Sequence, residues 1–266
     1  LATVQKALKH DIACRNSQLT LEAFARSPFI KDFRRRLEQA AAKSPHLLLR
    51  GVSGGMAEIC ARTLLPQQAH WRDLSTVTSV INQEFLQAAS GGLLFVPDLA
   101  ALGKLQQMNL AFALERLEKF NLQLIVASSR PLSALAEQGW DGKLLARLGE
   151  IWIAMPPLAG HADEIPEIAT LLLSHFIARG EVQLRRFSAG ALNVLRNQSW
   201  SNHQESGWVE LYVLVRNVAL NALDDEISAE DVMRVPPEEE EDGVEVAALA
   251  PLFEQPLREA RDAFEK

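Results

Sequence analysis

The sequence predicts an α/β fold, in which a parallel sheet carries helices on both of its faces and a small all-helical domain follows. Four short apolar runs, at 46–50, 93–96, 122–127 and 151–154, alternate with segments of helical periodicity. Such runs are typical of parallel strands, which are buried on both faces. From Asp163 onward the strand signals stop and helical patterns follow one another. We therefore expect the sheet to be complete before that residue.

The first strand lies between a capped helix and a glycine-rich turn. Ser27 can cap a helix that starts at Pro28, because proline suits the first helical position. We expect this helix to run to Lys43. The apolar strand 46–50 follows, and the glycine-rich segment 51–58 then leads into the next helix. This order of elements begins the α/β unit.

The later helices are predicted from periodicity and from signals at their ends. One helix is expected between the second and third strands, over 105–120, and four more after the sheet, over 164–178, 188–199, 207–223 and 228–234. Ser228 and Asp231 have the spacing of a capping box at the start of the last one. The acidic run 238–242 behind two prolines is expected to be a flexible linker.

The composition is that of a soluble protein without a general preference for nucleic acid. The 266 residues carry a formal net charge of −7, which argues against broad electrostatic binding of DNA by this segment. The two cysteines, Cys14 and Cys60, have neither metal-ligand spacing nor a disulfide framework. No apolar run is long enough to span a membrane. We therefore expect a cytoplasmic protein without a metal site and without a membrane partner.

Four segments resemble, in the same order, the motifs of the AAA+ central domain of NtrC-family transcription regulators. The glycine-rich segment 51–58 resembles G-E-S-G-T-G-K-E, and 88–99 resembles A-x-G-G-T-L-F-L-D-E-I. Residues 138–148 resemble G-x-F-R-x-D-L-x-x-R-L, and 155–165 resemble L-P-P-L-R-x-R-x-x-D-I. The family activates the sigma-54 form of RNA polymerase, so the resemblance implies a role in transcription regulation.

The resemblance divides the chain into four parts. It implies an AAA+ P-loop fold, with an α/β domain over 27–162 and a helical lid over 163–235. The flanks are similar to the NtrX-like branch of response regulators: 1–26 resembles the linker helix after a receiver domain, and 236–266 resembles the segment before a DNA-binding domain. The expected partners are therefore the receiver and DNA-binding domains of the same chain, and DNA is contacted only through a domain outside this fragment.

The glycine-rich segment keeps part of a phosphate-binding loop. A P-loop uses glycines so that backbone N–H groups can surround phosphates, and a lysine to reach the β- and γ-phosphates. Gly51, Ser53, Gly54 and Gly55 match this loop, but Ala57 stands where the family has the lysine. A tight turn between a strand and a helix explains the same glycines without a nucleotide. We therefore expect no cofactor, with bound ATP or ADP as the alternative.

The other positions for nucleotide chemistry have also changed. Pro97 matches the Walker B aspartate that helps to hold Mg²⁺, and proline offers no ligand. Asp98 matches the neighbouring catalytic glutamate but is one methylene shorter. Ser128 keeps a hydroxyl of the family's sensor pair, and Glu58 follows the position of the missing lysine. The resemblance therefore implies a degenerate ATPase without catalytic residues.

The arginines that meet the nucleotide in the family are mostly absent. Of the two that reach the nucleotide of a neighbouring subunit, the first matches Asp141 and the second matches Arg147. The sensor arginine of the lid corresponds to Val209. Arg147 could still bridge subunits, although a surface arginine near a strand is more often solvated or locally paired.

A loop of the working family is also missing. Between the positions of Arg62 and Glu84, family members carry a long insertion with the G-A-F-T-G-A loop, which touches the sigma factor. This chain has only residues 63–83 there, without that motif. The resemblance therefore implies a regulator that is unable to remodel sigma-54 polymerase.

The expected function is a non-hydrolysing module for oligomerisation and signal relay in a two-component transcription regulator. Two alternatives remain open: an ATP-binding switch without turnover, and a degenerate AAA+ scaffold subunit of another machine. We expect self-association as a homodimer, because a symmetric dimer needs one self-complementary patch and no nucleotide. The apolar candidates for this patch are Leu1, Val4 and Leu8 in the first terminal helix and Leu252, Phe253 and Leu257 in the last.

Overall fold

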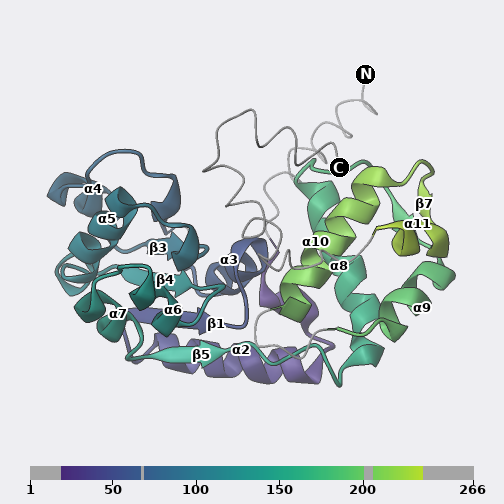
Figure 1. Cartoon of the computed structure of the whole chain (residues 1–266), viewed down its shortest axis with the longest axis horizontal. Helices are drawn as coiled ribbons and strands as arrows, with labels where there is room; N and C mark the ends of the chain where they lie inside the picture. Colours follow the sequence, from purple (N-terminus) through teal and green to yellow (C-terminus); the bar gives the residue numbers. More distant parts are fainter. Residues whose placement is uncertain (1–18, 67–68, 201–205, 236–266) are drawn as a thin grey trace, which may run out of the picture. The chain divides into compact units, whose positions relative to one another are not determined.

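The computed structural model places five strands in one parallel sheet, in the order β2-β3-β4-β1-β5 (Figure 1). The structure describes residues 19–66, 69–200 and 206–235. The strands are β1 (His46–Arg50), β2 (Trp71–Asp73), β3 (Leu93–Val96), β4 (Gln123–Ala127) and β5 (Trp152–Ala154). Four of them confirm the predicted apolar runs, and β4 and β5 each begin one residue later than predicted.

The strand β2 is not predicted by the sequence. It is a three-residue strand at the edge of the sheet, and its side chains are half-buried or exposed. Its strand conformation depends on pairing with β3, where Trp71 lies opposite Leu93 and Asp73 opposite Phe95. An edge strand of this length needs no apolar run, so the sequence carries no signal for it.

Alternate residues of the central strands pack into two hydrophobic cores, one on each face of the sheet. Leu47 and Phe95 contribute to the core that contains α2 (Pro28–Ala41) and α3 (Gly54–Thr63). Leu48 and Leu94 contribute to the other core. That core contains residues of α4 (Gln83–Ala88), α5 (Lys104–Leu114), α6 (Leu132–Glu137) and α7 (Gly142–Leu148). The predicted parallel sheet with helices on both faces is confirmed.

The helix ends follow local rules. The Ser27 hydroxyl accepts a hydrogen bond from Ile30 N at 3.3 Å, and Pro28 is the first helical residue, as predicted. The predicted helix 105–120 is confirmed up to Leu114, where α5 ends, and is wrong beyond it, because a separate 3-10 turn follows. Such turns are η1 (Leu21–Phe24), η2 (Leu74–Thr76), η3 (Leu99–Ala101), η4 (Glu118–Phe120) and η5 (Ala162–Glu164).

The lid is a helical bundle, as predicted, with one small addition. Its helices are α8 (Ile165–Ala178), α9 (Ala189–Asn197), α10 (Ser206–Asn221) and α11 (Ala229–Arg234). A parallel pair of two-residue strands, β6 (Arg186–Phe187) and β7 (Glu226–Ile227), joins the starts of α9 and α11. The predicted capping box at α11 is confirmed, since Ser228 and Asp231 bond each other's backbone N–H groups.

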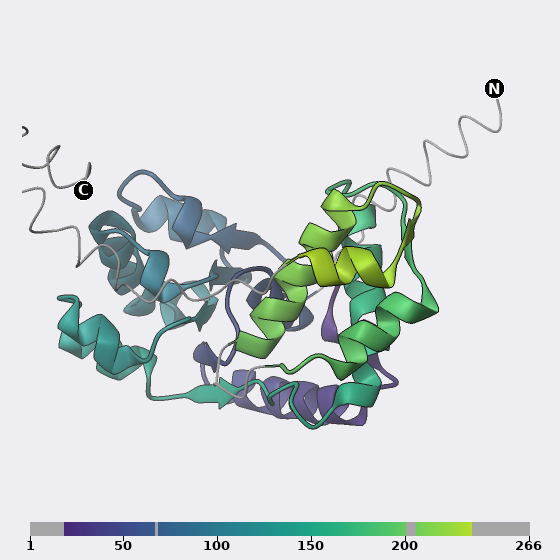
Figure 2. The same cartoon turned by 45° about the vertical axis from the view of Figure 1, so that its right-hand side comes forward.

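The lid and the α/β domain share a hydrophobic core. Buried residues of α8 and α10, such as Leu172 and Leu211, belong to the same cluster as Met56 and Ile59 of α3. Both views show α10 beside α3 (Figures 1 and 2). The predicted boundary at 162/163 therefore divides the sequence but not the core. Among the described residues, no helix is long and apolar enough to cross a membrane.

Candidate functional site

The glycine-rich segment forms a tight turn from β1 into α3. Gly51 and Gly54 have φ angles of +78° and +56°, which glycine adopts without strain. The helix begins at Gly54, and Ser53 stands at the cap position without a side-chain cap. The Gly54 N–H donates a hydrogen bond to the Pro97 carbonyl at 3.0 Å, so the turn is tied to the end of β3. This bond uses one of the backbone donors that a P-loop offers to phosphates.

The position of the missing lysine lies inside the protein. The side chain of Ala57 is completely buried, and so is that of its neighbour Met56, which replaces a family glycine. Both side chains pack in the core shared by the sheet and the lid. Residue 57 therefore lies in an apolar environment.

The acidic residue after Pro97 is used by the protein itself. Asp98 Oδ1 accepts from Ser129 N at 2.9 Å and from Ala100 N at 3.0 Å, and Oδ2 accepts from Ser129 Oγ at 2.6 Å. These bonds connect the segment that follows β3 in sequence to the segment that follows β4. The hydroxyl of Ser128 donates to the Arg130 carbonyl at 2.6 Å. Asp98 and Ser128 therefore both lie at the carboxyl ends of neighbouring strands, and each side chain is hydrogen-bonded to nearby residues of its own chain.

Glu58 belongs to an ion-pair chain between α3 and the lid. Its carboxylate lies 2.7 Å from Arg62 Nε and 3.8 Å from a nitrogen of Arg179. Arg179 also pairs with Glu181 at 2.6 Å, and Glu181 pairs with Arg216 of α10 at 3.2 Å. The sequence analysis assigned Glu58 to the remnant of a nucleotide site, and the structure places its carboxylate in ion pairs within α3 and with the lid. The sequence analysis did not identify the two lid arginines of this chain of ion pairs, Arg179 and Arg216.

A tyrosine of the lid lies directly on the glycine turn. A Cβ atom built on Gly55 would overlap the Tyr212 hydroxyl and would stand 2.7 Å from its Cε1. Burial, together with the charge of Glu181, raises the pKa of Tyr212 to about 12, so its hydroxyl stays protonated at neutral pH. Tyr212 comes from α10, one turn after the half-buried Val209. The sequence prediction singled out Val209 and missed Tyr212.

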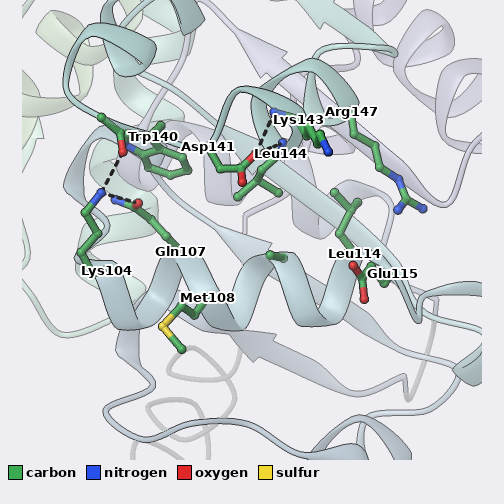
Figure 3. Close-up of a pocket in the computed structure, with 12 residues that line it drawn as sticks. Lys104, Gln107, Met108, Leu114, Glu115, Trp140, Asp141, Lys143, Leu144 and Arg147 are labelled. Carbon is green, nitrogen blue, oxygen red and sulfur yellow. Dashed lines mark hydrogen bonds between the residues drawn. The ribbon is translucent and has the colours of Figure 1, made fainter.

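Asp141 and Arg147 stand where the family has the two arginines that reach a neighbouring subunit's nucleotide, and both line a separate cavity. This cavity of about 680 Å³ lies between α5 and α7 (Figure 3). Asp141 caps α7, and hydrogen bonds from Leu144 N and Lys143 N lower the pKa of its carboxyl. The side chain of Arg147 extends away from Asp141 and makes no hydrogen bond or ion pair with any described residue. The structure therefore does not bring Asp141 and Arg147 to the glycine turn.

The described part of the segment between α3 and α4 is bonded to the sheet and to α5. Its β2 strand joins the sheet, and the buried side chain of Asn109 holds the chain that follows. Asn109 Oδ1 accepts from Ile81 N at 3.0 Å, and its Nδ2 donates to the Ser79 carbonyl at 2.9 Å. Gln106 adds a bond to the Val77 carbonyl at 3.3 Å. The described part of this segment, which we call the connector, is thus hydrogen-bonded to α5 through Asn109 and Gln106.

Nothing in the described part of the chain forms a cluster of three or more histidine, cysteine, aspartate or glutamate side chains that could hold a metal ion. Cys60 is a buried free thiol on α3. The apolar residues predicted for dimerisation, at 1–8 and 252–257, lie outside the described residues.

Comparison with known proteins shows that the chain is similar to one family domain and to several transcription regulators. Residues 24–158 match the model of the sigma-54 interaction domain. The transcriptional regulatory protein ZraR of Escherichia coli (strain K12) is 23% identical over 240 residues, which cover 75% of this chain and 54% of ZraR. GlrR of the same strain is 27% identical over 237 residues, covering 74% and 52%. The chain therefore spans about half the length of the curated relatives it matches.

A solved structure shows the same fold at low identity. The crystal structure of NtrX from Brucella abortus in complex with ADP has a TM-score of 0.57 and 19% sequence identity. The similarity covers 98% of this chain and 64% of that one. At this identity the comparison supports the fold alone, which agrees with the parallel sheet and the helical lid described above.

Proposed function

The chain belongs to the sigma-54 interaction domain family, which matches more than half of its length, and from this premise we propose that it assembles and relays a signal without hydrolysing ATP. It is an NtrC-family, sigma-54 activator-like AAA+ domain of a transcription regulator. The proposal concerns what this domain does inside that regulator. The proposal rests on one observation: Ala57 and Pro97 stand where the family has the lysine and the magnesium ligand.

The chemistry of the glycine turn supports an inactive ATPase. Ala57 is completely buried, and Pro97 uses its carbonyl to accept the Gly54 N–H. An arginine finger contributes a factor of about 10³–10⁵ to phosphoryl transfer, and one oxyanion-type donor about 10²–10³. These factors are not additive, but the loss of even one leaves little turnover. Here the lysine and the metal ligand are both replaced.

The pinned connector supports a role other than remodelling of polymerase. Members of the family carry a G-A-F-T-G-A loop at the place that corresponds to the segment between α3 and α4, whereas residues 63–83 of this chain contain no such motif. Asn109 and Gln106 bind the backbone of this segment to α5. A connector held in this way offers no long loop to a sigma factor. We therefore propose regulation through assembly and through the receiver and DNA-binding domains of the whole protein.

One observation favours the second candidate, a nucleotide-binding switch without turnover. The N–H groups of Gly55 and Met56, at the start of α3, make no hydrogen bond with any described residue. Free N–H groups at a helix start can hold a phosphate. Weak binding of ATP or ADP is therefore compatible with this turn, whereas hydrolysis requires the groups that are absent.

A phosphate-release assay tests the proposal. The chain is incubated with saturating Mg-ATP, and inorganic phosphate is followed over a series of protein concentrations. We expect a rate equal to that of the blank without protein. Release that rises in proportion to the protein concentration would contradict the proposal. A calorimetric titration with Mg-ATP on the same sample separates the two candidates, because only the switch binds nucleotide.

A further inference from the structure

Gly55 and Tyr212 form a matched pair between the glycine turn and the lid. A Cβ atom on residue 55 would overlap the Tyr212 hydroxyl and Cζ and would lie 2.7 Å from Cε1. Real side chains do not approach each other so closely, so the tyrosine can occupy this place only because residue 55 is glycine. The family motif quoted above has threonine at this position. This chain therefore differs at the point where its lid touches the turn.

The ring of Tyr212 is held by its neighbours in the lid. It packs edge-on against Phe176 of α8, with ring centroids 4.8 Å apart and an interplanar angle of 78°. One turn earlier on α10, Trp208 Nε1 donates to the Pro156 carbonyl at 2.7 Å, which ties the helix to the segment behind β5. Edge-to-face aromatic pairs of this kind are favourable beyond their buried area.

An ion-pair chain closes the same interface on its polar side. It runs from α3 through the end of α8 to α10, and its members are Arg62, Glu58, Arg179, Glu181 and Arg216. The Glu58 and Glu181 carboxylates each lie between two arginines, and both side chains are about three-quarters buried, at 25% and 24% exposure. Networks of partly buried pairs hold geometry better than single exposed pairs. The tyrosine thus sits between an apolar and a charged layer.

The tyrosine supplies a contact that elsewhere depends on a ligand. In the family, the lid reaches the nucleotide through a sensor arginine, and Val209 at that position has no charge to offer. Tyr212 lies on the same helix and contacts the turn directly, at Gly55. We propose that Tyr212 is a positioning residue that holds the helical lid, α8–α11, on the glycine turn in the absence of nucleotide. This inference deepens the proposed function and rests on it.

Hydrogen exchange measured by mass spectrometry tests the inference on the whole chain without nucleotide. Gly55→Thr places a side chain where Tyr212 lies, so α10 must move outward. We expect amide exchange in α10 to become about tenfold faster. Exchange in the central strands β1 and β4 should stay unchanged. The double variant Gly55→Thr, Tyr212→Ala removes the obstruction and should return α10 part of the way to the protection of the wild type.

Three further variants keep the result interpretable. Gly142→Thr is the matched control, because a Cβ at this exposed glycine meets nothing within 4 Å. Tyr212→Phe keeps the ring and should keep the protection of α10. Tyr212→Ala leaves the turn intact, and so it tests the contact even if Gly55→Thr does not fold; we expect faster exchange in α10 with β1 unchanged. Two results would overturn the inference. One is an α10 in Tyr212→Ala that exchanges as slowly as in the wild type. The other is a double variant whose α10 is no better protected than in Gly55→Thr.

Addition of Mg-ATP separates this inference from the proposed function. If the wild type hydrolyses ATP but α10 still loses protection in Tyr212→Ala without nucleotide, the proposed function fails and the positioning role stands. If the wild type shows no turnover and Tyr212→Ala leaves α10 fully protected, the positioning role fails and the proposed function stands.

Discussion

Asp98 binds Ser129 through both of its carboxylate oxygens, at 2.9 Å from the backbone N and 2.6 Å from Oγ. Asp98 follows β3 and Ser129 follows β4, so these bonds join two neighbouring strands at their carboxyl ends. A third donor, Ala100 N, also points at this carboxylate. A group with three donors from its own chain is suited to hold structure rather than to activate water.

Replacement of Asp98 should therefore lower stability. Asp98→Ala removes the acceptor of three hydrogen bonds. A hydrogen bond to a charged group contributes about 1.5–3 kcal/mol to stability. Because this position is half-buried, water compensates for part of the loss. We expect the free energy of unfolding in urea to fall by about 2 kcal/mol. Asp225→Ala is the control, since this exposed side chain makes no hydrogen bond or ion pair with any described residue, and it should change stability by less than about 0.5 kcal/mol. Equal effects of the two substitutions would contradict the structural role of Asp98.

Asn109 should be equally important for the connector. Asn109→Ala leaves the Ile81 N–H and the Ser79 carbonyl without their partner, and an unsatisfied buried group costs about 1–3 kcal/mol. We expect a loss of about 2–3 kcal/mol in urea unfolding and faster hydrogen exchange over residues 77–82. Met108→Ala, at the exposed neighbour, should leave both measurements unchanged. Normal protection of 77–82 in Asn109→Ala would show that the asparagine does not hold this segment.

Cys60 should be protected from alkylation in the folded protein. Burial raises the pKa of its thiol from 9.0 to about 12, and the thiolate is the reactive form. In a Cys14→Ser variant, we expect iodoacetamide at pH 8 to label Cys60 at least about 100-fold more slowly in buffer than in urea. Similar rates in both solvents would mean that the thiol is accessible in the folded state.

The same shift gives stability a defined dependence on pH. The folded protein holds the Cys60 proton more tightly than the unfolded chain, for which the pKa is near 9.0. The contribution of this thiol is therefore complete below pH 9 and is lost as the pH rises from 9 towards 12. Cys60→Ala should weaken this loss at alkaline pH, which urea unfolding at pH 8 and pH 10 would measure.

The fold was largely predictable because its central strands are apolar runs that need no partner to be identified. Leu47 and Leu48 point to opposite faces and are both buried, which is what an uninterrupted apolar run indicates. The edge strand β2 was not predictable, since Trp71 pairs with Leu93 through contacts distant in sequence. The two-residue pair β6–β7 is missed for the same reason.

The candidate site was predictable where a motif marks a position and not where tertiary contacts define it. The glycine turn and the replaced residues Ala57 and Pro97 follow from the resemblance. Tyr212 depends on a contact between residues 157 positions apart, and its signal in the sequence is indirect: glycine at position 55 where the family motif has threonine. The uses of Glu58 and Asp98 as structural acceptors likewise depend on partners that no motif marks.

Mass measured by light scattering, with and without Mg-ATP, tests most directly whether this domain works without nucleotide. The chain is measured over a series of concentrations from the dilute limit upward, and each sample is repeated with saturating Mg-ATP. We expect a dimer whose mass and concentration dependence are the same in both conditions, because assembly relies on contacts outside the glycine turn. A hexamer that appears only when Mg-ATP is present would contradict the account.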